Sequence, residues 1–436
     1  MAGGRTLVVG GVVLAMVGVI GAAASMQRPA SDDGPSPLAA RFEERRLRAA
    51  GTPEARLAEL QQRARADGND WRAWAGLGLA YLDQARRSGD SRLYPKAERS
   101  LDRSLEIRPE GNVTALVGHS ALAAARHDFE QALVWADRAS AVSADDPDVL
   151  GALGDAQIEL GRYDEGFETF QRMVDRRPDL ASYARVAYAR ELQGDVPGAI
   201  AAFDAARRAA STAADDAFAT FQLAELHWNS GNADRAAELY GRAQQLDPGL
   251  VAAPAALARV AYWQGRPADA AAALEAVVER LPLPQFLAEL GDIYAVSGRP
   301  DAAAEQYELV ELQRRLGTGN GVVADVDAAL FSADHGLALD RGLADAQAQY
   351  ARRPGNVFVA DALAWQLHKH GRHGEALAHA DEALRLGTRR AAFHYHRATI
   401  RQALGMADSA RADLEAARAI NPHFSILHGP VAPPAP

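Results

Sequence analysis

Histidines gather toward the end of this 436-residue chain, where they could bind a transition metal. Eight of the 12 histidines follow residue 367, and the candidate ligands among them are His368, His370, His373, His394 and His396. Neutral imidazoles bind zinc, nickel or copper when three or four ligands converge. His394 and His396 would point to different faces of a helix, since residues i and i+2 do not meet. A metal-handling protein is therefore one alternative, and a polar turn with cations near a helix end is the other.

The remaining reactive residue types favour a protein that is not an enzyme. The chain contains no cysteine, which excludes thiol nucleophiles, thiolate metal ligands and disulfides. Lys96 and Lys369 are its only lysines. No phosphate-binding glycine loop, zinc-hydrolase motif or nucleophile elbow occurs. We therefore predict no catalytic residues and no cofactor.

The charge balance points to a protein or peptide partner. The chain carries 47 Lys+Arg against 57 Asp+Glu, a formal net charge of -10. Nucleic-acid binding needs concentrated positive charge that displaces counterions from phosphates. We therefore expect no nucleic-acid partner.

A glycine-centred turn recurs along the chain at intervals of about 34 residues. Its glycines are Gly161, Gly194, Gly231, Gly265, Gly298, Gly371 and Gly405, with spacings of 33, 37, 34, 33, 73 and 34. A small residue stands five positions after each glycine, and prolines close several units. Apolar residues at helical spacing on both sides of such a turn predict two antiparallel helices. One hairpin cannot bury its apolar face alone, so successive hairpins must stack.

The repeated unit resembles the tetratricopeptide repeat of bacterial proteins that are membrane-anchored or exported. The best units carry the family signature as Trp74, Leu77, Gly78, Tyr81, Ala97, Leu101, Pro109 and as Leu153, Gly154, Gly166, Phe170, Pro178. The resemblance covers residues 71–424 and implies an all-α, right-handed superhelical solenoid of about ten repeats. These would start near residues 71, 113, 147, 180, 217, 251, 284, 323, 357 and 391. Residues 41–70 are expected to form a capping helix, and residues 425–436 a disordered tail.

The resemblance also implies a concave groove, lined by the first helix of each repeat. Transferring the family's concave positions gives the groove residues Tyr188, Phe221, Glu225, Trp228, Arg259, Tyr262, Asp292, Trp365 and Tyr395. Tyr, Trp and Arg dominate binding energy at interfaces, although aromatic rings at helical spacing also form cores. The resulting prediction is a non-catalytic scaffold that binds a protein segment in this groove during assembly of an envelope-associated complex. A further alternative is an apoprotein chaperone of the cytochrome c biogenesis type, whose repeat domains residues 59–82 resemble in style.

The N-terminus predicts export. Residues 7–24, LVVGGVVLAMVGVIGAAA, form an uncharged apolar run of 18. A membrane-spanning helix needs about 20 such residues, so residues 1–27 are expected to be a signal-anchor, with a cleaved signal peptide as the alternative. Residues 28–40 are rich in Pro, Ser, Gly and Asp, which is typical of a flexible linker. We expect a single-pass cell-membrane protein with its solenoid outside the cytoplasm, or a secreted protein if the segment is cleaved.

Overall fold

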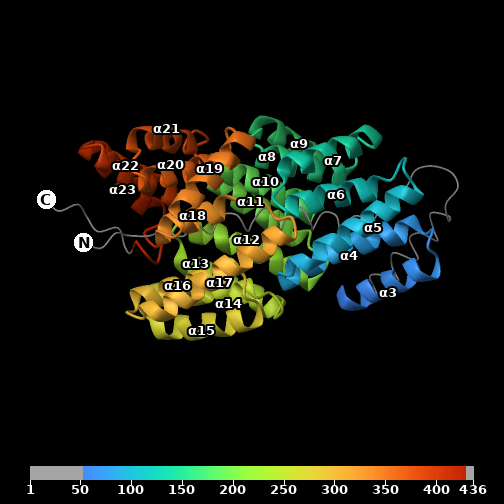
Figure 1. The fold of residues 1–436 in the computed structure, drawn as a ribbon, viewed down its shortest axis with the longest axis horizontal. Helices are drawn as coiled ribbons and strands as arrows, with labels where there is room; N and C mark the ends of the chain where they lie inside the picture. Colours follow the sequence, from blue (N-terminus) through green and yellow to red (C-terminus); the bar gives the residue numbers. More distant parts are fainter. Residues whose placement is uncertain (1–52, 429–436) are drawn as a thin grey trace. The chain divides into compact units, whose positions relative to one another are not determined.

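Helices follow one another through the described part of the chain as far as residue 420, as the sequence predicted. The computed structural model describes residues 53–428, which contain helices α3 to α23 and one short 3-10 turn, η1 (Figure 1). No helix between residues 53 and 428 is both long enough and apolar enough to cross a membrane. The expected signal-anchor, the linker and the first part of the capping segment lie outside the described residues.

Contacts divide these residues into two compact units, which are described separately. The N-terminal unit comprises residues 53–157 together with the loop 319–323, and the C-terminal unit comprises residues 158–318 and 324–428. The boundary falls inside one helix, α8.

The N-terminal unit begins with one unpaired helix and continues with antiparallel pairs. Its helices are α3 (Pro53–Ala66), α4 (Trp71–Ser88), η1 (Ser91–Leu93), α5 (Tyr94–Ile107), α6 (Val113–Ala125), α7 (Phe129–Val142) and most of α8 (Pro147–Glu159). Helix α3 covers the first pair, because Leu60 and Ala64 pack against Leu77 of α4. The fully buried Leu101 of α5 lies so close to Gly78 and Gly118 that a Cβ at either glycine would lie 2.5 Å from it. Small residues thus let α4, α5 and α6 approach closely.

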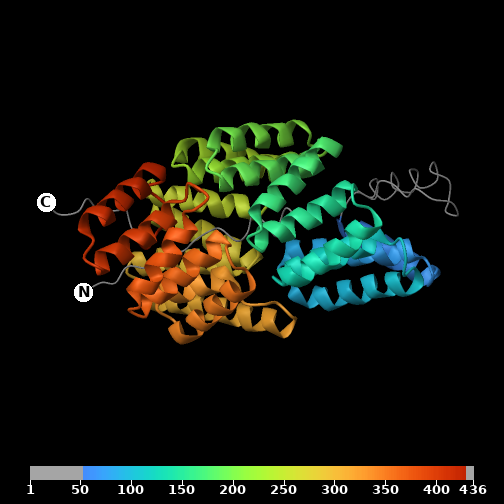
Figure 2. The same cartoon turned by 90° about the horizontal axis from the view of Figure 1, so that it is seen from above.

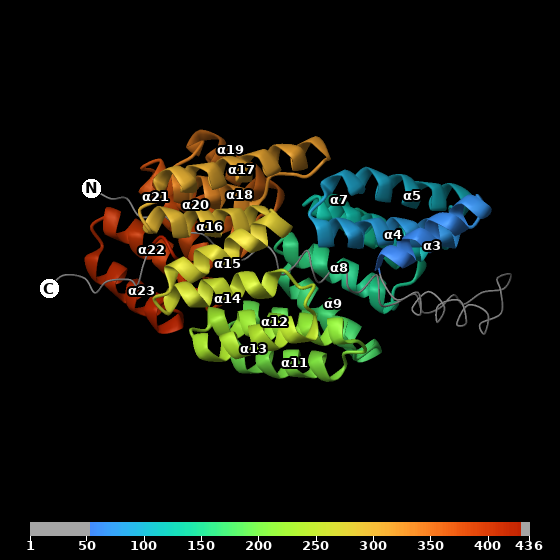
Figure 3. The ribbon, with the colours of Figure 1, turned by 90° about the horizontal axis from the view of Figure 1, so that it is seen from below.

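The C-terminal unit continues the same alternation of helices, seen as antiparallel hairpins coloured green to red in Figure 2 and Figure 3. Consecutive helices, such as α12 with α13 and α13 with α14, pack against each other. The elements are α9 (Tyr163–Arg176), α10 (Leu180–Leu192), α11 (Val196–Arg208), α12 (Ala213–Asn229), α13 (Ala233–Leu246), α14 (Ala252–Trp263), α15 (Pro267–Arg280), α16 (Pro284–Val296), α17 (Pro300–Gly319), α18 (Val326–His335), α19 (Leu339–Arg352), α20 (Val357–Lys369), α21 (His373–Ala383), α22 (Ala391–Ala403) and α23 (Ala407–Ile420).

Local sequence signals explain where these helices begin and end. All seven of the recurring glycines have φ between 74° and 80°, the left-handed conformation that ends a first helix. Polar side chains then start several of the helices: Asp195 accepts from the Gly198 amide and Asn232 from the Arg235 amide. Prolines such as Pro178 and Pro248 stand just beyond the second helices, which they cannot continue.

Three turns of the C-terminal unit contact loops that lie almost 200 residues further along the chain. In each, a later side chain donates to a carbonyl at the end of an earlier first helix. The donors and acceptors are Asn356 Nδ2 to Glu159 O (2.8 Å), Thr388 Oγ1 to Leu192 O (2.5 Å) and Asn421 Nδ2 to Trp228 O (2.9 Å). The last four carbonyls of a helix have no partner within it, so these bonds satisfy buried acceptors. They close the C-terminal unit on itself.

Candidate functional site

The structure buries most of the residues predicted to line the groove. Tyr262 and Tyr395 are half-buried, and the other seven have exposed fractions of 8% or less. Trp365 and Asp292 are each only 1% exposed. The predicted residues therefore divide into a buried set, which holds neighbouring first helices together, and a smaller set that reaches a surface.

The buried set includes a charged network between α12 and α14. Arg259 Nη2 donates to Glu225 Oε1 (2.7 Å), and Tyr240 Oη donates to the same oxygen (2.5 Å). The guanidinium also lies 4.9 Å from the ring centroid of Trp228. Burial alone would lower the pKa of Arg259, but the carboxylate of Glu225 raises it above its ordinary value. Because an unpaired buried charge is costly, we expect these residues to stay bound to one another.

A second network of hydrogen bonds centres on Asp292 of α16. Tyr307 Oη donates to Asp292 Oδ1 (2.9 Å), and His335 Nε2 lies 2.8 Å from the same oxygen. The other ring nitrogen of His335 lies 2.8 Å from Phe331 O. Asp292 thus links α16 to α17 and α18.

Trp365 on α20 is enclosed in the same way. Its indole Nε1 donates to Asp334 Oδ1 (2.7 Å). The ring of His396 stacks on it at 4.3 Å, and the ring of His368 at 5.1 Å. Trp365 is therefore a core residue that joins α18, α20 and α22.

The C-terminal histidines do not converge on a metal-binding geometry. His396 Nδ1 lies 2.9 Å from Asp361 Oδ1, His370 Nδ1 lies 2.8 Å from Gln366 O, and His394 Nδ1 lies 3.5 Å from Asp413 Oδ1. His368 and His373 approach each other with ring centroids 4.8 Å apart. Within residues 53–428, no three His, Cys, Asp or Glu side chains are grouped so that they could hold a metal ion.

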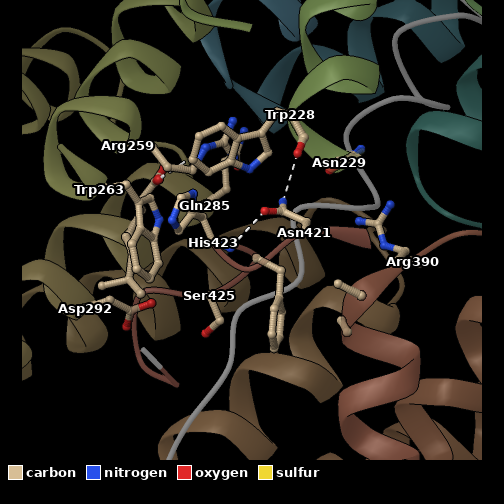
Figure 4. A pocket seen from close by; sticks show the side chains of 15 residues that line it. Trp228, Asn229, Arg259, Trp263, Gln285, Asp292, Arg390, Asn421, His423 and Ser425 are labelled. Carbon is tan, nitrogen blue, oxygen red and sulfur yellow. Dashed lines mark hydrogen bonds and ion pairs between the residues drawn. The ribbon is translucent and has the colours of Figure 1, made fainter. Parts of the chain in front are cut away.

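A surface with remaining space lies where α12, α14 and α16 face the start of α22 (Figure 4). We call this surface the groove. It is formed by Trp228, Asn229, Arg259, Trp263, Gln285, Glu289, Asp292, Arg390, Ala391 and Ala392. Burial raises the pKa of Glu289 to about 7, even though Arg259 acts in the opposite direction. The groove thus combines aromatic rings, a cation and a carboxyl group that titrates near neutrality.

The segment that follows the last helix lies on this groove, and the sequence did not predict it there. Residues 421–428, which we call the C-terminal segment, include Ser425 and Ile426 with exposed fractions of 4% and 8%. Residues 425–428 of the tail expected to be disordered are instead packed against the C-terminal unit. The signal in the sequence was the apolar run Phe424-Ser-Ile-Leu after Pro422, which is unusual for a solvated tail.

One tetratricopeptide repeat family model matches residues 227–288, and a second matches residues 113–181 and 185–251. No curated protein matches the chain. Similar solved structures include a tetratricopeptide repeat protein from Parabacteroides merdae, with 14% identity and a TM-score of 0.40 over 57% of this chain and 98% of that one. Yeast Tom70 is 14% identical, with a TM-score of 0.40 over 84% of this chain and 87% of that one. The human IFIT1 dimer with PPP-AAAA is 15% identical, with a TM-score of 0.44 over 87% of this chain and 96% of that one.

Proposed function

The chain is a tetratricopeptide repeat protein, and from this premise we propose that it is a non-catalytic scaffold that binds an extended segment of another protein in the groove of its C-terminal unit. Proteins of this family generally bind other proteins or peptides. The observation that carries the proposal is that aromatic rings remain partly accessible in the groove and beside it. Tyr262 and Trp263 of α14 and Tyr395 of α22 are half-buried, whereas Trp228 and Trp365 are already used as core.

The chemistry of the groove suits a peptide more than a small molecule. Large amphipathic rings supply contact area with little loss of conformational freedom, and the polar side chains of Arg390 and Gln285 also line the groove (Figure 4). Small-molecule sites usually enclose about 300–1,000 Å³. The free cavity here has about 60 Å³.

Site-specific photocrosslinking tests the groove. A photoreactive phenylalanine analogue in place of Trp263 should form adducts with one partner protein in the source cells. The same analogue in place of Glu238, an exposed residue of α13, is the matched control. Equal adducts from both positions would contradict the groove assignment.

Substitution provides the quantitative test. Replacing Tyr262, Trp263 and Tyr395 together by Ala should remove the crosslinked partner from an affinity pull-down while helical circular dichroism is retained. Leu404→Ala with Met406→Ala, which removes side chains that are each 39% exposed, should leave the pull-down unchanged. Unchanged pull-down by the triple variant would reject the proposal.

We also propose that residues 1–27 attach the protein to a membrane, with the repeats outside the cytoplasm, where the scaffold would serve assembly of an envelope-associated complex. The support is the apolar run at residues 7–24, preceded by Arg5. The full chain should resist carbonate extraction and be cleaved by protease added from outside the cell membrane. Release of the full chain by carbonate, or its protection from external protease, would contradict this placement.

A further inference from the structure

The C-terminal segment contacts the groove through side chains spaced along its length. The ring of His423 stacks on Trp263 with centroids 4.8 Å apart. The ring of Phe424 lies 5.3 Å from that of Tyr395, and the ring of His428 stacks on the same tyrosine at 4.5 Å. Trp263 of the groove and Tyr395 beside it are thus the partly accessible rings that the segment touches.

Two apolar anchors of the segment enter different parts of the C-terminal unit. Phe424 packs against the cluster of α18–α22 that contains Leu363 and Trp365. Ile426 belongs to the cluster of α14–α17 that contains Phe286 and Tyr294. An aromatic residue and a branched aliphatic residue two positions later therefore bridge two apolar clusters.

Polar contacts fix the start and the end of the segment. Asn421 Nδ2 donates to Trp228 O at 2.9 Å, and Asn421 Oδ1 accepts from the His423 amide at 2.8 Å (Figure 4). Near the other end, Ser425 Oγ accepts from the His428 amide at 3.3 Å. The closing contact at Asn421 is separate from the apolar anchors, so the anchors can leave their clusters while Asn421 stays in place.

The space left beside the segment is too small for a second peptide. The adjoining cavity has about 60 Å³, and its lining includes the segment residues His423, Phe424 and Ile426 themselves. A cavity of this size holds only a few water molecules. Another chain can cover the ring faces of Trp263 and Tyr395 on which His423 and His428 stack only if residues 423–428 move away.

We propose that the C-terminal segment occupies the site to which the partner binds. The groove recognises an extended segment of another protein that carries an aromatic residue and, two positions later, a branched aliphatic residue. The partner segment binds by displacing residues 423–428. This inference rests on the proposed function, because it specifies the ligand of the same groove and makes its occupancy competitive.

Binding of a synthetic peptide tests the competition. The probe is a fluorescent peptide of sequence NPHFSILH, added to the full chain or to the full-chain double variant Phe424→Ala/Ile426→Ala. Because the variant's own segment has lost both anchors, it should bind the peptide at least about tenfold more tightly than the unmodified chain. A peptide with Ala in place of both Phe and Ile should not bind either protein. Leu404→Ala/Met406→Ala, which removes exposed apolar groups from the same repeats, should bind like the unmodified chain.

A thiol probe keeps the proposal testable if the double variant folds poorly. The chain has no cysteine, so Ser425→Cys introduces a single thiol at a position that is 4% exposed. Its labelling should be slow in the free protein and rise about tenfold when saturating NPHFSILH displaces the segment. Met406→Cys, at a position 39% exposed, should react quickly with or without the peptide.

The outcomes separate this inference from the proposed function. Equal peptide affinity for the unmodified chain and the double variant, or Ser425→Cys labelling that the peptide does not change, would overturn the inference. Partner crosslinks at Trp263 would then still support the groove as a binding site. Loss of those crosslinks while the peptide binds competitively would instead reject the proposed function and leave a self-occupied groove.

Discussion

The two units use the same helix pair but meet the returning chain in different ways. In the N-terminal unit, the turn between α6 and α7 has His127 at φ 60°, where other repeats have glycine. The loop 319–323 contacts this turn through a backbone hydrogen bond from Val323 N to Arg126 O (2.9 Å). In the C-terminal unit the turns at Gly161, Gly194 and Gly231 are met by side-chain donors. At Gly161, Gly194 and Gly231 the later loop lies directly against the glycine.

Seven similar glycine turns thus have two different roles. A Cβ at Gly161 or Gly231 would lie 2.6 Å from a backbone atom of the returning loop, and one at Gly194 would collide with the carbonyl of Gly387. A Cβ at Gly265, Gly298, Gly371 or Gly405 would meet nothing within 4 Å. The repeat motif alone does not distinguish the two groups, since all seven have the same backbone conformation.

The largest effect should come from Gly194→Ala. The substitution combines left-handed strain with a backbone collision, so we expect a loss of about 3 kcal/mol or more in the free energy of unfolding. Gly371→Ala, which has only the strain, should cost about 1–2 kcal/mol. Urea unfolding followed by circular dichroism measures both. Equal losses would show that the contact with Gly387 contributes nothing.

One buried group in each unit should make the free energy of unfolding depend on pH, and the two dependences should have opposite signs. In the N-terminal unit, burial lowers the pKa of His119 from 6.5 to about 4. Below pH 6.5 the unfolded chain takes up a proton that the native chain refuses, so this contribution to stability is lost as pH falls. In the C-terminal unit, burial raises the pKa of Glu289 from 4.5 to about 7. Here the native chain keeps a proton that the unfolded chain releases, so stability is lost as pH rises from 4.5 to 7.

Variants isolate these two contributions, each of which amounts to at most about 3 kcal/mol. Unfolding free energies should be measured from pH 4 to pH 8 for His119→Gln and Glu289→Gln. The first variant should lose less stability in acid than the unmodified chain, and the second should lose less on going from pH 4.5 to 7. Parallel profiles for the unmodified chain and both variants would rule out titration of these groups as the cause.

A smaller effect should separate a closing contact from an ordinary helix cap. Asn356 is 3% exposed, accepts from the Phe358 and Val359 amides, and donates to Glu159 O. Its replacement by Ala leaves a buried carbonyl unsatisfied and should cost about 2–3 kcal/mol. The exposed cap Asn232 makes only the local bond to Arg235, and its replacement by Ala should cost about 1 kcal/mol. If thermal unfolding shows equal shifts, the contact with Glu159 O adds nothing to the cap.

The smallest effect concerns release of the C-terminal segment in acid. Burial lowers the pKa of His428 to about 2 in its site, where it faces Tyr395, Trp365, His396, His335 and Lys369. Since the released histidine binds a proton near pH 6.5, lowering the pH from 7.5 to 5.5 should favour release by about tenfold. The labelling rate of Ser425→Cys relative to Met406→Cys at each pH reports release and cancels the thiol's own titration. His428→Gln should reduce this pH dependence but not remove it, because burial also lowers the pKa of His423 in the same segment. An unchanged pH dependence would assign the effect to another group.

Much of the local structure followed from residue types. Glycine at a fixed interval and apolar residues at helical spacing predicted helix pairs, because turn and helix preferences act within a few residues. The groove was harder to predict, since Glu225 is hydrogen-bonded by Arg259, Asp292 by Tyr307 and His335, and Trp365 by Asp334. Most of these partners come from the adjoining repeat, 31 to 43 residues away. A single residue's type therefore does not reveal whether its side chain faces a ligand or a neighbouring helix.

By itself the sequence determined an all-helical repeat architecture, the position of the glycine turns and the absence of any thiol chemistry. Only the tertiary structure decided that the turns at Gly161, Gly194 and Gly231 meet loops 193 to 197 residues later, and that residues 421–428 lie in the groove. The physical reason is that backbone preferences are local, whereas these contacts depend on small rotations between repeats that accumulate along the stack. A change in any one rotation would leave every hairpin intact and still separate the groups that close the unit.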